Sequence, residues 1–137
     1  MGKTKILDCT LRDGGYINHW LFGQENIQTI IRKLAEAKIE VVECGFITDK
    51  TPYHPDSSQF DSVGRIRPYL PVNRRGVKFV AMINYGEYKA ENLEPRTESD
   101  IDGIRVAFHK KDLKSALEFC KAIQAKGYDV FIQPMVS

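Results

Sequence analysis

Short runs rich in β-branched residues recur along the chain and are separated by polar or helical stretches. Each run is almost continuously apolar, which is typical of parallel strands that are buried on both faces. The pattern therefore predicts five strands, at Lys5–Cys9, Glu40–Phe46, Val77–Ile83, Gly103–Phe108 and Asp129–Met135.

Two of the intervening stretches have the 3.6-residue period of an amphipathic crossover helix. In the first, polar positions lie opposite an apolar face made of Ile27, Ile30, Ile31, Leu34 and Ala35. In the second, the apolar face comprises Leu113, Ala116, Leu117, Cys120 and Ile123. Gly127 follows this second helix, where a left-handed cap is expected.

The middle of the chain gives a weaker pattern. A short helix through Phe60, Val63 and Ile66 is expected, limited by Pro68, and residues 87–92 predict a turn or two. Alternation of strands and helices predicts an α/β fold with a parallel sheet. A length of 137 residues favours an open, doubly wound sheet of the flavodoxin type. The alternative is the amino-terminal part, about five βα units, of a TIM (β/α)8 barrel, which needs about 250 residues.

Charge and composition favour small-molecule chemistry. The net charge is +2, and scattered basic residues form neither a nucleic-acid stripe nor a membrane-binding face. The opening residues lead directly into a strand pattern, with no signal peptide or membrane span, so the expected location is cytoplasmic. Cys9, Cys44 and Cys120 each lie in an apolar run, without the spacing of a zinc or redox motif, and are expected to be reduced core thiols.

The run Asp8–Tyr16 carries the clearest candidate chemistry. The apolar stretch that begins with the first predicted strand ends at Arg12 and Asp13, which are followed by Gly14 and Gly15. Since carboxyl ends of parallel strands open onto the ligand crevice, Arg12 and Asp13 are expected to face a substrate. A carboxylate suits Mg²⁺ or Mn²⁺, a guanidinium can hold a carboxylate or an enolate oxygen, and glycines allow a tight turn and close approach to a ligand. On residue types alone, a solvent-exposed Arg/Asp pair in a Gly-Gly turn is about as common as a ligand site at such a position.

Asp8–Gly14 resembles the Asp-x-Thr-Leu-Arg-Asp-Gly motif of the DRE-TIM metallolyase superfamily. These pyruvate-carboxyltransferase-like barrels include hydroxymethylglutaryl-CoA lyase and the isopropylmalate and homocitrate synthases. Val42–Phe46 resembles the second-strand Glu-x-Gly-Phe of the lyase branch. Arg105–His109 is similar to the fourth-strand Arg-Val-Ala-x-His of the 4-hydroxy-2-oxovalerate aldolases, the group that the chain resembles most. The resemblance implies that residues 1–137 are a partial TIM-barrel aldolase or lyase domain, truncated before the carboxyl-terminal strands.

The resemblance also implies roles for individual residues. Asp13 corresponds to a ligand of the catalytic divalent metal, Mn²⁺ or Mg²⁺, and Arg12 to the group that stabilises the enolate of a 2-oxo acid. Gly14 and His109 fall at substrate-binding positions. Glu43 corresponds to a second active-site carboxylate, although a strand-end Glu can equally pair with a neighbouring Lys or Arg.

Departures from the aldolase pattern concern the general base. Tyr16 stands where those enzymes have a histidine, and a phenol with a pKa near 10 is a poor base that can still donate a proton or orient a substrate. His19 is a candidate substitute, but packing of Asn18–Trp20 onto the barrel rim is favoured by roughly two to one. His109 can equally be a hydrogen-bonded rim residue.

The family completes its metal site with a His-x-His pair from a later strand, and no residue of this sequence corresponds to it. The isolated chain is therefore expected to be inactive or nearly so. Unpaired edges at its first and fifth predicted strands favour a homo-oligomer or another association through the sheet edges. The main hypothesis is a metal-dependent aldolase or lyase acting on a 2-oxo acid. The alternatives are a Claisen-type acyltransferase, a flavodoxin-like binding domain and a catalytically idle scaffold.

Overall fold

The structure, a computed structural model, describes residues 6–14, 18–74 and 76–135. Within these ranges six parallel strands form one sheet: β1 (Leu7–Asp8), β2 (Val41–Ile47), β3 (Gln59–Phe60), β4 (Lys78–Asn84), β5 (Gly103–His109) and β6 (Asp129–Met135). The α-helices are α1 (Thr10–Asp13), α3 (Gln24–Glu36), α4 (Val63–Ile66) and α5 (Leu113–Ala125). Three 3₁₀ turns accompany them: η1 (Arg67–Tyr69), η2 (Ala90–Asn92) and η3 (Lys110–Asp112).

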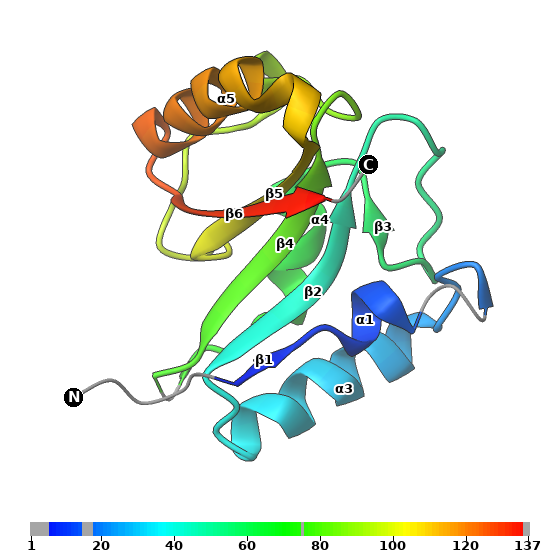
Figure 1. The fold of residues 1–137 in the computed structure, drawn as a ribbon. Coiled ribbons are helices and arrows are strands. Elements are labelled where there is room, and N and C mark those ends of the chain that lie inside the picture. The colour runs from blue at the N-terminus through cyan, green and yellow to red at the C-terminus, as the bar shows by residue number, and fades with distance from the viewer. Residues whose placement is uncertain (1–5, 15–17, 75, 136–137) are drawn as a thin grey trace.

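The sheet follows the order of the chain. Its strands are arranged β1-β2-β4-β5-β6, and the short β3 pairs with the carboxyl end of β2. A doubly wound sheet reverses direction at a switch point, and the described strands do not. The flavodoxin-like alternative is therefore wrong, and the α/β fold is a half-barrel with helices. Figure 1 shows α5 over β5 and β6 at one end of the sheet and α3 along β1 and β2 at the other.

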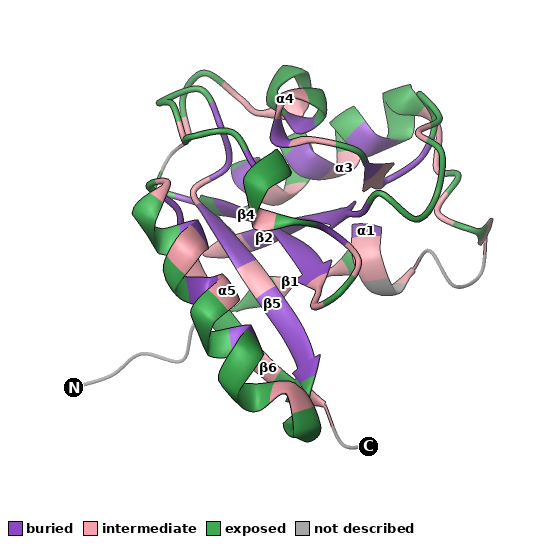
Figure 2. Ribbon diagram, turned by 90° about the horizontal axis from the view of Figure 1, so that it is seen from above, coloured by how far each residue is buried: buried purple, intermediate pink, exposed green. Residues whose placement is uncertain are grey.

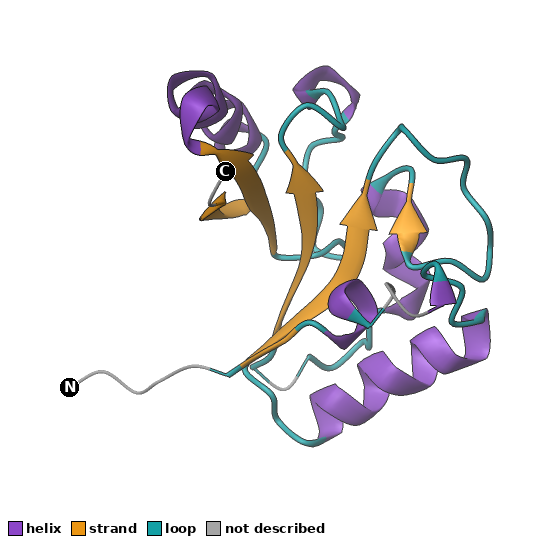
Figure 3. Cartoon of the chain, turned by 45° about the vertical axis from the view of Figure 1, so that its right-hand side comes forward, coloured by secondary structure: helices purple, strands orange, loops and turns teal. Residues whose placement is uncertain are grey.

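The two faces of the sheet differ in what covers them. The outer face carries apolar side chains such as Val42, Phe79 and Ile104, which pack with helix residues such as Ile27 and Ile123 in the main core. Figure 3 shows the helices ranged around the strands. Figure 2 shows that β2, β4 and β5 are mostly buried, whereas the helices are exposed on their outward sides. The inner face carries a smaller cluster of buried residues, Phe46, Met82 and Ala107, against which Trp20 and Met135 pack. An apolar outer face and a concave inner face are the arrangement of barrel strands.

Most predicted elements are confirmed, with boundaries shifted by one or two residues. The last strand is observed as predicted, and both amphipathic helices are present. Gly127 has φ of +100°, which confirms the left-handed cap. No helix in the described part of the chain is long and apolar enough to cross a membrane.

Three side-chain placements were wrong. Phe60 belongs to β3 and not to a helix, because its backbone pairs with the end of β2. Leu113 and Leu117 are 49% and 40% exposed. Their helix α5 packs on β5 and β6, and this contact buries only a narrow stripe, Ala116, Cys120 and Ile123.

The cysteines follow the expectation in part. Cys44 and Cys120 are buried thiols, and desolvation by burial raises the pKa of each above its usual value. Cys9 is half-buried beside α1, so a core position was wrong for it. Buried thiols with a raised pKa are poor nucleophiles, and we assign Cys44 and Cys120 to packing.

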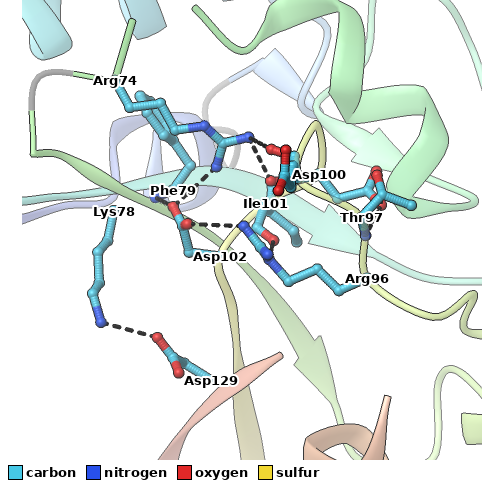
Figure 4. Close-up of polar contacts among 10 residues, drawn as sticks. Arg74, Lys78, Phe79, Arg96, Thr97, Asp100, Ile101, Asp102 and Asp129 are labelled. Atoms are coloured by element: carbon cyan, nitrogen blue, oxygen red, sulfur yellow. Dashed lines mark hydrogen bonds and ion pairs between the residues drawn. The ribbon is translucent and has the colours of Figure 1, made fainter. Parts of the chain in front are cut away.

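Loops at the amino ends of β4 and β5 are joined by the amino-end network, which we define as Arg67, Arg74, Arg96, Asp100 and Asp102. Figure 4 labels these residues except Arg67. Asp102 accepts hydrogen bonds from both Arg74 and Arg96, at 3.2 Å each, and from the backbone N–H of Phe79 at 2.9 Å. The same two guanidinium groups also donate to the backbone carbonyls of Glu98, Asp100 and Ile101. The network therefore fixes loop backbone as well as pairing charges.

Candidate active site

The motif at Asp8–Gly14 forms the end of β1 and the short helix α1. The Asp8 carboxylate accepts hydrogen bonds from the backbone N–H of Thr10 at 2.9 Å and from its hydroxyl at 3.1 Å. This bonding satisfies an otherwise unpaired N–H at the start of the helix. Leu11 is fully buried in the main core. The first four residues of the motif therefore hold α1 so that the next residue, Arg12, reaches the inner face of the sheet.

Ser58 fixes α1 against the rest of the site. Its buried hydroxyl donates to the Leu11 carbonyl at 2.7 Å, and its backbone N–H donates to the Trp20 carbonyl at 2.9 Å. Its own carbonyl accepts from the backbone N–H of Phe46 at 3.0 Å. The Trp20 indole N–H in turn donates to the Arg12 carbonyl at 2.7 Å. Contacts among segments that are far apart in sequence thus set the position of Arg12.

Three charged side chains meet on the inner face and form the inner cluster, Arg12, Glu43 and Arg105. Arg12 donates from Nε to one Glu43 oxygen, and Arg105 donates from Nη1 to the other at 2.9 Å. Glu43 is fully buried, and the side chains of both arginines are 13% exposed. A buried carboxylate needs such partners, since an isolated charge would be expelled to water or neutralised. Two guanidinium groups face one carboxylate, so these three side chains carry a net positive charge.

Gly45 makes this geometry possible. Its φ is +139°, and an added Cβ would lie 2.0 Å from the Ser58 carbonyl oxygen. The pairing of β2 with β4 shifts register between Glu43 and Phe46, which is the behaviour of a β-bulge. Residues three apart normally point to opposite faces of a strand, yet Glu43 and Phe46 both serve the inner face. The glycine of the Glu-x-Gly-Phe motif is therefore required by close backbone approach.

The predicted site residues are only partly brought together. Arg12 lies on the inner face, where it pairs with Glu43, and its expected contact with a substrate stays a prediction. Glu43 does not end its strand, because β2 continues to Ile47. Its pairing with Arg12 and Arg105 confirms the interpretation that it forms ion pairs with neighbouring basic residues. His109 is exposed at the carboxyl end of β5, and His19 is exposed in a left-handed conformation with φ of 56°. Neither histidine has a hydrogen bond or ion pair with the inner cluster in the described part of the chain.

Several predictions concern the segment around α1. Gly14 has φ of −61°, an ordinary helical value, so the expected tight turn does not use glycine's freedom there. Gly14 is instead needed for space, because a Cβ would lie 2.6 Å from the Thr10 carbonyl oxygen. The backbone of Asp13 ends α1, but its side chain lies outside what the structure describes, as do Gly15 and Tyr16. The roles expected of Asp13 and Tyr16 therefore stay predictions.

The sequence analysis assigned no role to Arg105 or Ser58. Arg105 gave a signal, since it is a lone cation within the apolar run 103–108, where burial demands a partner. Ser58 gave none, because a serine in a polar loop is ordinary and its three contacts come from distant segments.

The described residues do not by themselves make a metal site. Among the side chains that the structure describes, which leave out Asp13, no three His, Cys, Asp or Glu gather in a way that could hold an ion. Both Glu43 oxygens accept hydrogen bonds from guanidinium groups, which makes Glu43 a poor ligand in this arrangement.

Comparison with known proteins finds similarity among solved structures. No protein-family model and no curated protein matches the chain. A solved structure, the N-terminal domain of a putative aldolase from Bacteroides vulgatus, is similar with a TM-score of 0.66 and 26% identity. The match covers 96% of this chain and 44% of that one, so the chain spans less than half the length of this neighbour. The neighbour supports an aldolase-like fold for the half-barrel.

Proposed function

We propose that the chain is part of a carbon–carbon lyase of the aldolase type, which forms or cleaves a bond next to a 2-oxo acid. The observation that carries the proposal is the convergence of Arg12 and Arg105 on the buried Glu43, on the inner face of a half-barrel. The aldolase-like neighbour supports the reaction class. We further propose that the half-barrel is the amino-terminal part, about five βα units, of a TIM barrel.

The inner cluster suits a reaction that develops negative charge on a carbonyl oxygen. Removing a proton beside a carbonyl, or cleaving a bond there, creates an enolate, and preorganised cations stabilise the enolate where its charge appears. Glu43 is positioned to hold the two guanidinium groups in place so that little reorganisation is needed during the reaction. A planar guanidinium also forks onto a carboxylate, which suits the acid group of a 2-oxo acid.

Metal dependence remains part of the proposal, with Mn²⁺ or Mg²⁺ as the ion. Asp13 is the ligand that the sequence resemblance names, and a usable site needs further ligands around the ion. When bound, the ion would add positive charge near the developing enolate. The steps assigned to this chain, binding the acid group and stabilising the oxyanion, belong to Arg12 and Arg105.

An open patch on the inner face supports the idea that the barrel is completed by more polypeptide. Leu7 and Phe131 are each 37% exposed, and with Val41 and Arg105 they line a largely apolar hollow of about 240 Å³. Apolar surface of this kind on a sheet with open edge strands favours association. We propose that this patch, between the edge strands β1 and β6, is the contact surface for the rest of the barrel.

Binding of oxalate, a planar dianion that mimics an enolised 2-oxo acid, tests the role of the inner cluster. Oxalate titrated into the ¹⁵N-labelled chain should shift the side-chain Nε–H resonances of Arg12 and Arg105. Arg12→Met should abolish saturable binding, whereas Arg65→Met, which changes an arginine on α4 that is 52% exposed, should leave it intact. Unchanged oxalate affinity in Arg12→Met would contradict the proposed site.

Exchange of pyruvate methyl protons into D₂O tests the reaction itself. The assay uses the whole natural polypeptide that carries this sequence, loaded with Mn²⁺ and followed by ¹H NMR. Arg12→Met should lower the exchange rate by about 100-fold or more, which is the usual effect of losing a donor to an oxyanion. A folded wild-type protein that binds Mn²⁺ but shows no exchange would remove pyruvate enolisation from the proposal.

A further inference from the structure

A second, smaller pocket lies at the carboxyl ends of the neighbouring strands β2, β3 and β4. It has a volume of about 230 Å³ and is lined by Trp20, Phe46, Thr48, Gln59, Asn84 and Glu87, which we call the mouth pocket. In α/β folds ligands bind at the carboxyl ends of strands. The sequence analysis singled out none of these residues as site residues.

The mouth pocket adjoins the inner cluster through Trp20 and Phe46. The Trp20 indole N–H donates to the Arg12 carbonyl, and its ring meets the Phe46 ring edge-on with centroids 5.7 Å apart. Phe46 follows Glu43 by three residues, across the bulge at Gly45. Trp20 and Phe46 therefore connect the mouth pocket with the segments that carry Arg12 and Glu43.

The polar side chains of the pocket are suited to hydrogen-bond with the hydroxyl groups of a ligand. Gln59 and Asn84 are half-buried, and neither side-chain amide makes a hydrogen bond with another part of the chain that the structure describes. Each amide offers two donor hydrogens and an acceptor oxygen to a ligand. The Glu87 carboxylate accepts a long contact of 3.4 Å from the Thr48 hydroxyl, so it retains capacity for further donors. Hydroxyl groups, which both donate and accept, match this combination.

The charges of the pocket disfavour an anionic ligand. Among the residues that the structure describes, neither lysine nor arginine lines the pocket, and Glu87 contributes a negative charge. A carboxylate or phosphate tail would meet Glu87 without a cation to balance it, at a cost in free energy. The inner cluster has the opposite character, with two guanidinium groups for one carboxylate.

The size of the pocket suits a short ligand. Its volume of about 230 Å³ is many times the roughly 10–15 Å³ that one water molecule needs on the same measure. This space suits a neutral molecule with three or four carbons and several hydroxyl groups. The rings of Trp20 and Phe46 provide apolar surface for its C–H groups.

We propose that the mouth pocket binds the second reactant, and that this reactant is a short, neutral, hydroxylated aldehyde. The identification as a reactant rests on the proposed aldolase function, whereas the binding of a polyol does not. The aldehyde carbon would accept the new carbon–carbon bond from the enolate, and the alkoxide formed would take up one proton. The reverse reaction breaks the same bond and returns the proton.

Tryptophan fluorescence gives a direct test of binding, since Trp20 is the single tryptophan of the sequence and lines the pocket. Erythritol serves as an unreactive probe of four hydroxylated carbons, with 1-butanol and 4-hydroxybutyrate as apolar and anionic counterparts. Erythritol should change the fluorescence saturably and bind more tightly than either counterpart. Asn84→Ala should weaken erythritol binding about five-fold, in line with the loss of a hydrogen bond. Gln124→Ala, which removes an exposed amide on α5, should have no effect.

A second variant keeps the test decisive if Asn84→Ala perturbs folding. Glu87→Gln is nearly isosteric and removes the negative charge, so it should raise the affinity for 4-hydroxybutyrate relative to erythritol. The proposal is overturned if erythritol does not bind, if its affinity is the same in Asn84→Ala, or if wild type prefers 4-hydroxybutyrate.

Measuring oxalate on the same samples separates this proposal from the proposed function. If erythritol binding depends on Asn84 but oxalate binding does not depend on Arg12, the mouth pocket is a polyol site and the proposed 2-oxo acid site is refuted. Oxalate binding that depends on Arg12, without erythritol binding, would support the proposed function and refute the mouth pocket as its aldehyde site.

Discussion

The inner cluster and the amino-end network both contain arginines paired with carboxylates, but the arginines differ in the other groups that they contact. In the amino-end network the guanidinium groups of Arg74 and Arg96 donate to backbone carbonyls as well as to Asp102, so they hold loops together (Figure 4). In the inner cluster the contacts of Glu43 are to the side chains of Arg12 and Arg105. Arginines that donate to loop backbone serve stability. Arg12 and Arg105, which pair with the buried Glu43 on the inner face, are the groups that we propose bind the 2-oxo acid.

The largest effect on stability should come from Asp102→Ala. Three donors lose their acceptor at once, namely Arg74, Arg96 and the backbone N–H of Phe79. The free energy of unfolding, measured by urea denaturation, should fall by about 4 kcal/mol. Asp129→Ala is the matched control. Its pair with Lys78 is about half exposed, and the expected change is below about 0.5 kcal/mol. Similar losses in both variants would contradict a special role for Asp102.

A smaller loss is expected for Glu43→Gln, about 2 kcal/mol, because Arg12 and Arg105 then face each other without a compensating charge. The triple variant Arg12→Met, Glu43→Leu, Arg105→Met should recover most of this loss, since apolar side chains can replace a buried ionic group at little cost. Its unfolding should be compared with Glu43→Gln by the same denaturation. A triple variant no more stable than the single one would show that the inner cluster is needed for folding, like the amino-end network.

The smallest expected effect is on how stability depends on acidic pH. Burial would raise the pKa of Asp100, but hydrogen bonds from the backbone and hydroxyl of Thr97 and from Arg67 outweigh it and hold that pKa below its usual value. A lowered pKa in the folded state gives stability that is present above the unfolded value near 4 and is lost as pH falls through the folded pKa. Asp100→Asn should therefore be less stable than wild type at pH 7, and this difference should shrink on titration below pH 4. An Asn variant whose deficit stays constant down to pH 2 would rule out this linkage.

Local sequence was sufficient where a pattern maps directly onto burial. The strands β2, β4, β5 and β6 and the helices α3 and α5 were predicted because apolar periodicity follows from which side faces the core. Failures came where contacts are non-local. Phe60 lies in a strand because its backbone pairs with the end of β2, which is distant in sequence. For the site, Arg12 was predicted to face a substrate, but Arg105, which pairs with the same Glu43, was assigned no role.

The sequence by itself determined the parallel α/β class and the placement of an arginine just after the first strand. Both follow from local patterns, because the burial of a strand and its ends depend on consecutive residues. Only the tertiary structure decided between a doubly wound sheet and a half-barrel, since the order of strands depends on contacts between distant segments. It also brought Arg12, Glu43 and Arg105 together across 62 residues from Glu43 to Arg105. A buried carboxylate must find cations, but which ones it meets is fixed by the curvature and register of the sheet.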